Sequence, residues 1–378
     1  MITRIKNGNV LIDGVFQKVD LFLDGKTIAS IGTQMSFDQE VDAEGNYVTA
    51  GFIDLHCHGG GGADFSDGDV EGVLCAAKLH LQHGTTTLFP TALSADFDAL
   101  EKAVCAIEEA QKQMPMLAGI HLEGPYFSPA QTGAQNGKVL RKPLAEEYQK
   151  ILSKHKIARW DYAPELDPDF QFLHALLADG VIPSAAHTDA TCAEMEAAAQ
   201  QGCRLITHLY SCTSTIRREA GFRIAGVVEA TYLRDDVCAE LIADGCHLPY
   251  SLLRLAYKLK GADRLVLVTD AMRAAGLEQT GAFDIGGVPC IVEDGVAKLL
   301  DRSAFAGSVA TADRLVRTCY AAGIPLADCV KMVTQTPAKI MGLHNKGCIA
   351  IGYDADIVIF GADIAVKKVF LQGEEMVW

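Results

Sequence analysis

The chain has 378 residues, 49% of them hydrophobic, and a formal net charge of −15. This length and apolar content suffice for one large domain with a smaller companion, and they exclude global disorder. The acidic balance argues against a nucleic-acid-binding surface, which needs a basic face. It also makes the binding of an anionic substrate dependent on local positive charge.

The first residues and the cysteines indicate the cellular setting. The start of the chain lacks the long apolar core of a signal peptide, and no run approaches the ~20 apolar residues of a membrane span. The 12 cysteines include no CxxC pair, and most, such as Cys75, Cys105 and Cys319, lie in helix-like apolar patterns. We therefore expect reduced core cysteines in a cytoplasmic protein without membrane or nucleic-acid partners.

The two ends of the chain share one style of short strands. Residues 1–50 are interrupted by turn-forming pairs such as Asp13-Gly14 and Asp24-Gly25. The last part repeats this style in three runs, Cys348–Ile351, Ala355–Phe360 and Lys368–Leu371. We expect residues 1–50 and 345–378 to pair into one small β-sandwich domain.

Residues 51–344 alternate between short apolar runs and longer helical patterns. The eight strand-like runs are Phe52–Cys57, Thr85–Pro90, Ala118–Glu123, Trp160–Glu165, Ile182–His187, Arg204–Leu209, Val237–Asp244 and Leu265–Asp270. Apolar runs separated by helices are typical of a parallel sheet buried on both faces. Eight β/α units predict an α/β fold of the (β/α)8 TIM-barrel type, and a doubly wound open sheet is the alternative. A β-hairpin insert is expected around residues 281–300, with a turn at Glu293–Gly295.

Histidines and carboxylates stand at the ends of the predicted strands. His56 and His58 end the first run, and side chains two residues apart on a strand share a face. The other runs end in His121 to Glu123, His187, His208, Asp244 followed by His247, and Asp270. Each of these histidines taken alone could be structural, but TIM-barrel active sites lie at this rim, so their joint placement favours a site.

This ligand set suits Zn²⁺ or Fe²⁺, since it offers nitrogen and oxygen and no thiolate set competes. Glu123 could bridge two metal ions, with His187 and His208 completing one site and His56 and His58 the other. Asp270 could orient a water molecule and take its proton. A metal ion held by such a set of ligands usually serves to activate a water molecule at neutral pH.

The residues at these strand ends also carry a family resemblance. The segments Gly51–His58, His121–Pro125, Ala186–Asp189, Thr207–Leu209, Ala243–His247, Val268–Ala271, Ala306–Ser308 and Gly347–Asp356 occur in the same order in the N-acetylglucosamine-6-phosphate deacetylases of the amidohydrolase superfamily, which the chain resembles over essentially its whole length.

The resemblance implies a role for each residue. Glu123, His187 and His208 would bind the catalytic metal, and the retained His56 and His58 make a second ion plausible, so that each subunit holds one or two. Asp270 would deprotonate the hydrolytic water and then protonate the leaving amine. His247 would polarise the acetamide carbonyl. The resemblance also suggests a homodimer whose partner subunit contributes to the phosphate site.

Substrate recognition is where the chain departs from the family pattern. A family histidine is replaced by Gln135, and a family Asn-Ala pair by Ser211 and Cys212, whereas Arg218 partly matches the family's phosphate arginine. Arg217, Arg218 and Arg223 form the densest basic cluster near the predicted rim and could hold a phosphate. The substrate contacts expected from the resemblance are Ala134, Gln135, Ser211, Cys212, Arg218, Asp244, His247, Phe305, Ala306 and Gly307.

We therefore predict a metal-dependent hydrolase that removes the acetyl group from an N-acetylhexosamine 6-phosphate, with N-acetylglucosamine 6-phosphate as the leading substrate. The galactosamine epimer is the near alternative, motivated by the three departures. A catalytically inactive metal-binding relative is a further alternative. Amidohydrolases that bridge their metals with a carboxylated lysine are disfavoured, because the run Trp160–Glu165 contains no lysine.

Overall fold

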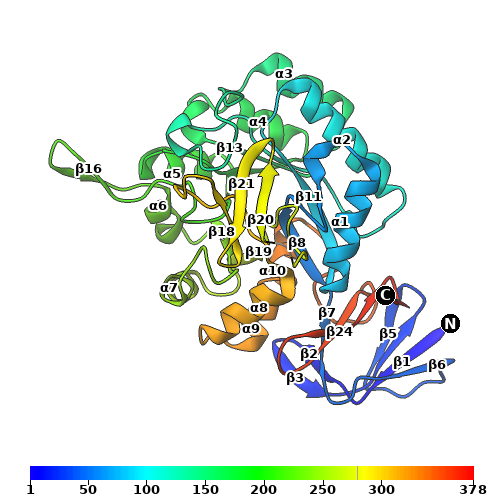
Figure 1. Ribbon diagram of the computed structural model, residues 1–378. Helices are drawn as coiled ribbons and strands as arrows, with labels where there is room; N and C mark the ends of the chain where they lie inside the picture. Colours follow the sequence, from blue (N-terminus) through cyan, green and yellow to red (C-terminus); the bar gives the residue numbers. More distant parts are fainter. Residues whose placement is uncertain (279) are drawn as a thin grey trace.

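The computed structural model describes residues 1–278 and 280–378. Its centre is a parallel eight-stranded sheet in the order β19-β18-β15-β14-β13-β12-β11-β8. The two outer strands also meet, because the Asp270 N–H donates to the His56 carbonyl at 2.9 Å and the His58 N–H donates to the Ala271 carbonyl at 2.8 Å. The sheet therefore curves into a barrel (Figure 1), and the open-sheet alternative is wrong. The strands are β8 (Phe52–Cys57), β11 (Thr85–Leu93), β12 (His121–Glu123), β13 (Arg159–Tyr162), β14 (Ile182–Ala185), β15 (Leu205–Ile206), β18 (Cys238–Ile242) and β19 (Leu265–Val268).

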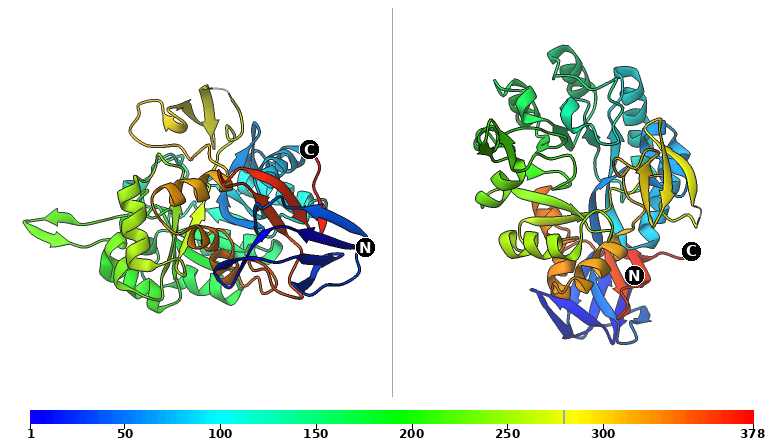
Figure 2. Two further views of the ribbon diagram at one scale, coloured as in Figure 1. Left: turned by 90° about the horizontal axis from the view of Figure 1, so that it is seen from below. Right: turned by 60° about the vertical axis from the view of Figure 1, so that its left-hand side comes forward.

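The helices form an outer ring around this barrel (Figures 1 and 2). The apolar side of α1, including Val73 and Leu81, is buried, and a capping box of Thr191 and Glu194 starts α5. The helices are α1 (Val70–Gln82), α2 (Phe97–Gln111), α3 (Ala145–Lys154), α4 (Gln171–Ala178), α5 (Cys192–Gln200), α6 (Val227–Leu233), α7 (Tyr250–Lys260), α8 (Ala312–Ala321), α9 (Leu326–Lys331) and α10 (Gln335–Ile340), with 3-10 turns η1 (Phe65–Asp67), η2 (Pro129–Gln131) and η3 (Pro164–Leu166).

Several barrel strands end earlier than their apolar runs predict. Strand β14 stops two residues before His187, and β19 stops two residues before Asp270. The backbone at His187, His208 and Asp270 is left-handed, with φ of 44°, 31° and 46°. Such conformations cost free energy in residues other than glycine and gather at functional sites. These side chains are therefore carried on turns just beyond the strands.

Strands from both ends of the chain lie together beside the barrel (Figures 1 and 2). They form a four-stranded sheet, β5-β4-β1-β6, and a six-stranded sheet, β25-β24-β23-β7-β2-β3, with Val10, Leu21 and Phe370 in a shared core. The predicted run Cys348–Ile351 is wrong as a strand, although Ile349 reaches this core. The strands are β1 (Ile2–Lys6), β2 (Asn9–Ile12), β3 (Val15–Lys18), β4 (Leu21–Asp24), β5 (Thr27–Ile31), β6 (Gln39–Asp42), β7 (Tyr47–Ala50), β23 (Ile357–Phe360), β24 (Val366–Leu371) and β25 (Glu374–Glu375).

Two smaller antiparallel units are inserted between barrel elements. The segment around 281–300 has three strands instead of a simple hairpin, because a turn at Gly286-Gly287 adds one strand before the expected turn at Asp294-Gly295. A narrow hairpin of β16 and β17 projects from the body of the molecule (Figures 1 and 2). The strands of these units are β16 (Arg217–Glu219), β17 (Phe222–Ile224), β20 (Gly281–Ile285), β21 (Val288–Glu293) and β22 (Val296–Leu299), and β9 (Gly59–Gly60) pairs with β10 (Ala63–Asp64).

The cysteines are all free, but not all of them lie in the core. Cys319 is buried, as expected, whereas Cys75 and Cys105 are exposed, so that part of the prediction is wrong. Both lie in helices whose buried residues are on the opposite side, and an apolar run alone does not place a residue on the inner face. Within the described residues, no helix has the length and apolar character needed to cross a membrane.

Candidate functional site

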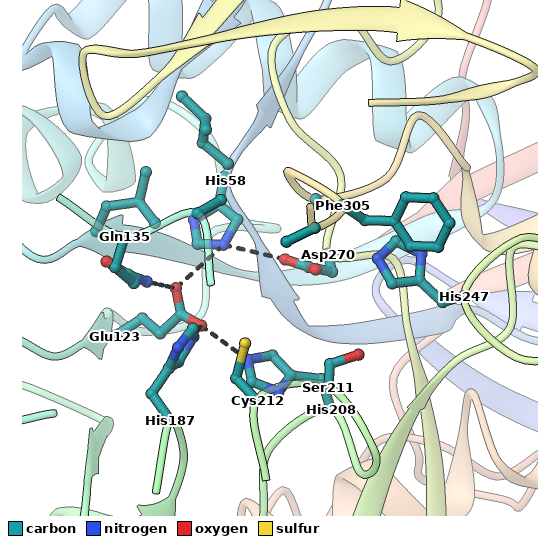
Figure 3. Close-up of a pocket in the computed structure, with 15 residues that line it drawn as sticks. His58, Glu123, Gln135, His187, His208, Ser211, Cys212, His247, Asp270 and Phe305 are labelled. Carbon is teal, nitrogen blue, oxygen red and sulfur yellow. Dashed lines mark hydrogen bonds and ion pairs between the residues drawn. The ribbon is translucent and has the colours of Figure 1, made fainter. Parts of the chain in front are cut away.

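A pocket at the carboxyl ends of the barrel strands gathers most of the predicted site residues (Figure 3). Its walls combine imidazoles and carboxylates from the strand ends with apolar side chains from the β20–β22 insert and the loop that follows it. The lining residues are His58, Leu93, Glu123, Ala134, Gln135, His187, His208, Ser211, Cys212, His247, Asp270, Ile285, Ala304, Phe305 and Gly307.

Glu123 is the centre around which four imidazoles converge. Its Oε1 lies 3.2 Å from His187 Nε2 and 3.0 Å from His208 Nε2. The same oxygen lies 3.6 Å from His56 Nε2, while Oε2 lies 3.4 Å from His58 Nε2. Two possible metal sites result, one from Glu123, His187 and His208 and one from Glu123, His56 and His58, and both are buried.

The second ring nitrogen of three of these histidines faces an oxygen acceptor. His187 Nδ1 lies 2.8 Å from the Gln131 carbonyl, and His58 Nδ1 lies 3.3 Å from the Thr91 carbonyl. His56 Nδ1 lies 3.3 Å from Glu240 Oε2. A histidine that donates its Nδ1–H in this way leaves an Nε2 lone pair free for a metal, which is the usual arrangement behind a metal site. The donor set therefore fits one or two divalent cations.

A buried charge network supports His56 from inside the barrel. Arg159 is fully buried and pairs with both Glu240 and Asp161. Burial alone would raise the pKa of Glu240, but the Arg159 charge outweighs it and lowers that pKa to about 2. Glu240 therefore stays ionised and can accept a hydrogen bond from His56. Sequence reasoning missed this network; its only signal is the unusual pair of charges, Arg159 and Asp161, on one face of an otherwise apolar strand.

The two carboxylates nearest the pocket floor are held in their ionised forms. Burial by itself would raise the pKa of Glu123, but the charge of His56 and the hydrogen bonds from His187 and His208 lower it well below its ordinary value. Asp270 Oδ1 lies 3.1 Å from His58 Nε2. This contact, together with the His56 charge, outweighs burial and lowers the pKa of Asp270. Asp270 can therefore accept a proton at the edge of the Glu123 cluster.

His247 stands across the pocket from Glu123 (Figure 3), and Asp244 orients it. Its Nδ1 lies 2.9 Å from Asp244 Oδ2, and its ring packs on Phe305 with 4.7 Å between centroids. Burial would raise the pKa of Asp244, but the hydrogen bond from His247 outweighs it and the pKa is lowered. An ionised Asp244 favours an imidazole that keeps its proton on Nδ1, which leaves Nε2 for a ligand.

Gln135, predicted as a substrate contact, also contacts Glu123 directly. Its Nε2 donates to Glu123 Oε2 at 2.6 Å, and its Oε1 accepts from the Ser94 N–H at 3.2 Å. Ser211 and Cys212 line the wall beside it. Burial would raise the pKa of the Cys212 thiol, but contact with His187 outweighs this and lowers it. Gln135 is thus fixed on Glu123, on the oxygen that faces His58.

Three predicted substrate contacts do not line the pocket. Arg218 is exposed on β16, in the hairpin that projects from the body of the molecule (Figure 1). Ala306 is fully buried in an apolar cluster with Met272 and Ile285, so its side chain packs inside the protein. Asp244 lies behind His247. Sequence reasoning also missed Leu93, Ile285 and Ala304, apolar residues without a chemical signature.

The chain as a whole is similar to proteins of known family. The amidohydrolase family model matches residues 47–376. The N-acetylglucosamine-6-phosphate deacetylases of Lysinibacillus sphaericus and Bacillus subtilis are 33% and 31% identical to the chain, and these alignments cover 94% and 98% of the chain and 93% and 92% of those proteins.

Solved structures agree with these relatives. The N-acetylglucosamine-6-phosphate deacetylase of Pasteurella multocida superposes with a TM-score of 0.93 at 30% identity, over 100% of both chains. A mutant of the Mycobacterium smegmatis deacetylase in complex with N-acetyl-D-glucosamine-6-phosphate superposes with a TM-score of 0.91 at 29% identity, over 99% of this chain and 98% of that one.

Proposed function

Because the chain belongs to the amidohydrolase family, and within it to the N-acetylglucosamine-6-phosphate deacetylases, it is a hydrolytic enzyme that acts on an amide, and we propose that its substrate is N-acetylglucosamine 6-phosphate. Water would cleave the acetamide C–N bond and release acetate and the amino sugar phosphate. The observation that carries the proposal is the meeting of the Glu123 imidazole cluster, Asp270 and His247 in one pocket.

Glu123, His187 and His208 would hold a divalent cation, Zn²⁺ or Fe²⁺, and His56 and His58 with Glu123 would hold a second one. Such a cation supplies Lewis-acid activation of water and of the amide carbonyl. Glu240, itself paired with Arg159, contacts His56 Nδ1 and would keep that imidazole in place.

Two residues would move and stabilise charge during hydrolysis. Asp270, ionised at neutral pH, would take a proton from the attacking water and pass it to the nitrogen of the departing amine. His247, with its Nδ1–H held by Asp244, would carry a second proton on Nε2 and donate it as a hydrogen bond to the carbonyl oxygen as negative charge develops there. Phe305, whose ring packs against His247 at a tilted angle, would exclude water from that side.

The direct test compares four substrates. Acetate release should be fastest with N-acetylglucosamine 6-phosphate, slower with the galactosamine epimer, and slowest with the two non-phosphorylated sugars, as measured by kcat/KM. A higher kcat/KM for the galactosamine epimer would instead support that alternative, which the departures at Gln135, Ser211 and Cys212 motivate. Absence of acetate release from all four sugars by the metal-loaded protein would contradict deacetylation.

The His56–His58 pair is expected to govern the number of metal ions. The double variant His56→Asn, His58→Asn should lower the metal content toward one ion per chain and leave measurable activity, because Glu123, His187 and His208 are untouched. Metal analysis by mass spectrometry together with an acetate assay checks this. Complete loss of metal would show that the first-strand pair anchors the whole site.

We propose that the phosphate group is held in part by the projecting hairpin of a second subunit. Arg218 is exposed on this hairpin, and so is the apolar Phe222 beside its turn, at 75% exposure; Ile216, just before β16, is also exposed. An exposed apolar side chain near a basic residue suits docking on another chain, as in a homodimer. All cysteines are free, which supports a cytoplasmic location for this assembly.

Arg218→Ala is accordingly expected to raise KM for the phosphorylated substrate about tenfold, the effect of losing a charge-assisted contact of about 1.5 kcal/mol. KM for the non-phosphorylated sugar should stay unchanged. Mixing this variant with Asp270→Asn chains tests whether the arginine acts across the dimer. Hybrid dimers would then regain activity at low substrate concentration, because one of their two pockets combines an intact Asp270 with the partner's intact arginine. If hybrids of proven mixed composition show no recovery, Arg218 acts in the pocket of its own subunit or in no pocket.

A further inference from the structure

Another group of possible metal ligands lies on the outer ring of helices, away from the pocket. Cys105 Sγ, a carboxylate oxygen of Glu108 and a ring nitrogen of His155 all lie within 4.8 Å of one another. Cys105 and Glu108 are three residues apart on α2, and His155 stands at the carboxyl end of α3 (Figure 1). None of the three lines the pocket around Glu123.

His155 is buried between two carboxylates, and its hydrogen bonding is incomplete. Its side chain is only 7% exposed, with Nδ1 3.1 Å from Glu108 Oε2. Its Nε2 is buried without a hydrogen-bond partner and lies 3.8 Å from Glu101 Oε1. A neutral imidazole has one N–H and cannot donate to both carboxylates. A buried polar atom without a partner indicates that something further belongs there.

A bound cation would use both ring nitrogens. If the metal replaces the proton on the nitrogen beside Cys105 and Glu108, the other nitrogen carries the N–H and directs it toward Glu101 Oε1, which lies 3.8 Å away, slightly beyond hydrogen-bond distance. A ligating histidine usually shows this arrangement, with its second N–H on a carboxylate. Lys154 already pairs with Glu101, so that carboxylate is neutralised and can serve as an acceptor.

Charge and exposure also suit a cation. The Cys105 thiol is exposed, so its proton can leave to solvent when a metal binds, and a water molecule can reach the fourth position. The Cys105 thiolate and the Glu108 carboxylate together balance a divalent charge. One sulfur, one nitrogen and one oxygen ligand around a four-coordinate ion match the preference of zinc.

We propose that Cys105, Glu108 and His155 bind a zinc-class divalent cation that links α2 to the carboxyl end of α3. The site is independent of the catalytic pocket and of the proposed substrate. It fastens the helix that follows β11 to the segment that leads into β13, and these two strands flank the strand carrying Glu123.

The first test counts zinc. Protein equilibrated with zinc chloride and freed of unbound metal should carry one more zinc per chain than the His155→Asn variant treated in the same way. Cys105→Ser, a change at an exposed position that should not disturb folding, is expected to lose the same ion. Cys75→Ser is the matched control, because Cys75 is an exposed thiol on the neighbouring helix α1 and, among the residues that the structure describes, belongs to no such group; it should keep the wild-type count. Equal zinc contents in the wild type, His155→Asn and Cys105→Ser would overturn the proposal.

The second test does not depend on metal counting. Zinc should slow the alkylation of Cys105 by iodoacetamide at least tenfold in the wild type, followed on its tryptic peptide by mass spectrometry. Cys75 in the same sample should react at an unchanged rate. In His155→Asn, zinc should no longer protect Cys105. Alkylation of Cys105 at the same rate with and without zinc would show that its sulfur is not a ligand and would overturn the proposal.

Discussion

Glu123→Gln is expected to abolish acetate release and to reduce the metal content to nearly zero. The carboxylate is shared by both possible metal sites, and the neutral amide would leave four buried imidazoles without their common anion. Loss of the Lewis acid removes several kcal/mol of transition-state stabilisation, which corresponds to a fall in kcat/KM of at least about a thousandfold.

Metal analysis and an acetate assay on the same sample check this prediction. Glu194→Gln is the matched control, because glutamine can replace glutamate in the α5 capping box and that residue lies outside the pocket. A Glu123→Gln protein that keeps both full metal content and activity would show that the histidines alone hold the site.

Asp270→Asn is expected to lower kcat by about 10²–10⁴-fold, the usual contribution of a general acid–base group. Asparagine has nearly the same shape but cannot accept a proton. KM should change little, since Asp270 acts on the water and the leaving nitrogen and not on the sugar. The metal held by Glu123, His187 and His208 should be retained, because none of those three residues changes.

Parallel kinetics and metal analysis separate this role from a structural one. The pH–rate profile of the variant should lose the acidic limb that reports ionisation of the base, while Glu194→Gln should keep it. If the variant loses metal in proportion to activity, Asp270 is required to hold the ion and its role as a base is not needed to explain the defect.

Local patterns in the sequence predicted much of the catalytic end of the barrel. His56 and His58 follow from their two-residue spacing at the end of an apolar run, and both point toward Glu123. The eight apolar runs predicted the barrel because each strand is buried on both faces. The same patterns predicted strands that were too long. His187, His208 and Asp270 have left-handed backbone conformations, which hydrophobicity does not reveal, and the strands end before them.

Side-chain partners far apart in the chain were harder to predict. Gln135 lines the pocket as a substrate contact would, but its hydrogen bond to Glu123 was not foreseen, and Arg218 was expected at the rim but lies on a projecting hairpin. Arg159 and Glu240, 81 residues apart, meet inside the barrel without any local signature. Cys105 was expected in the core, because an apolar helical pattern does not specify which face a small residue occupies.

The sequence by itself therefore determined the barrel, the ligand types and the residues that could bear them, because burial period and chemical identity are local properties of the chain. Only the tertiary structure decided which of them meet. Glu123 lies 64 residues from His187 and 85 from His208, and their contact depends on the curvature of the whole parallel sheet. The same long-range packing brings His155 to Cys105 and Glu108 and keeps Arg218 out of its own pocket.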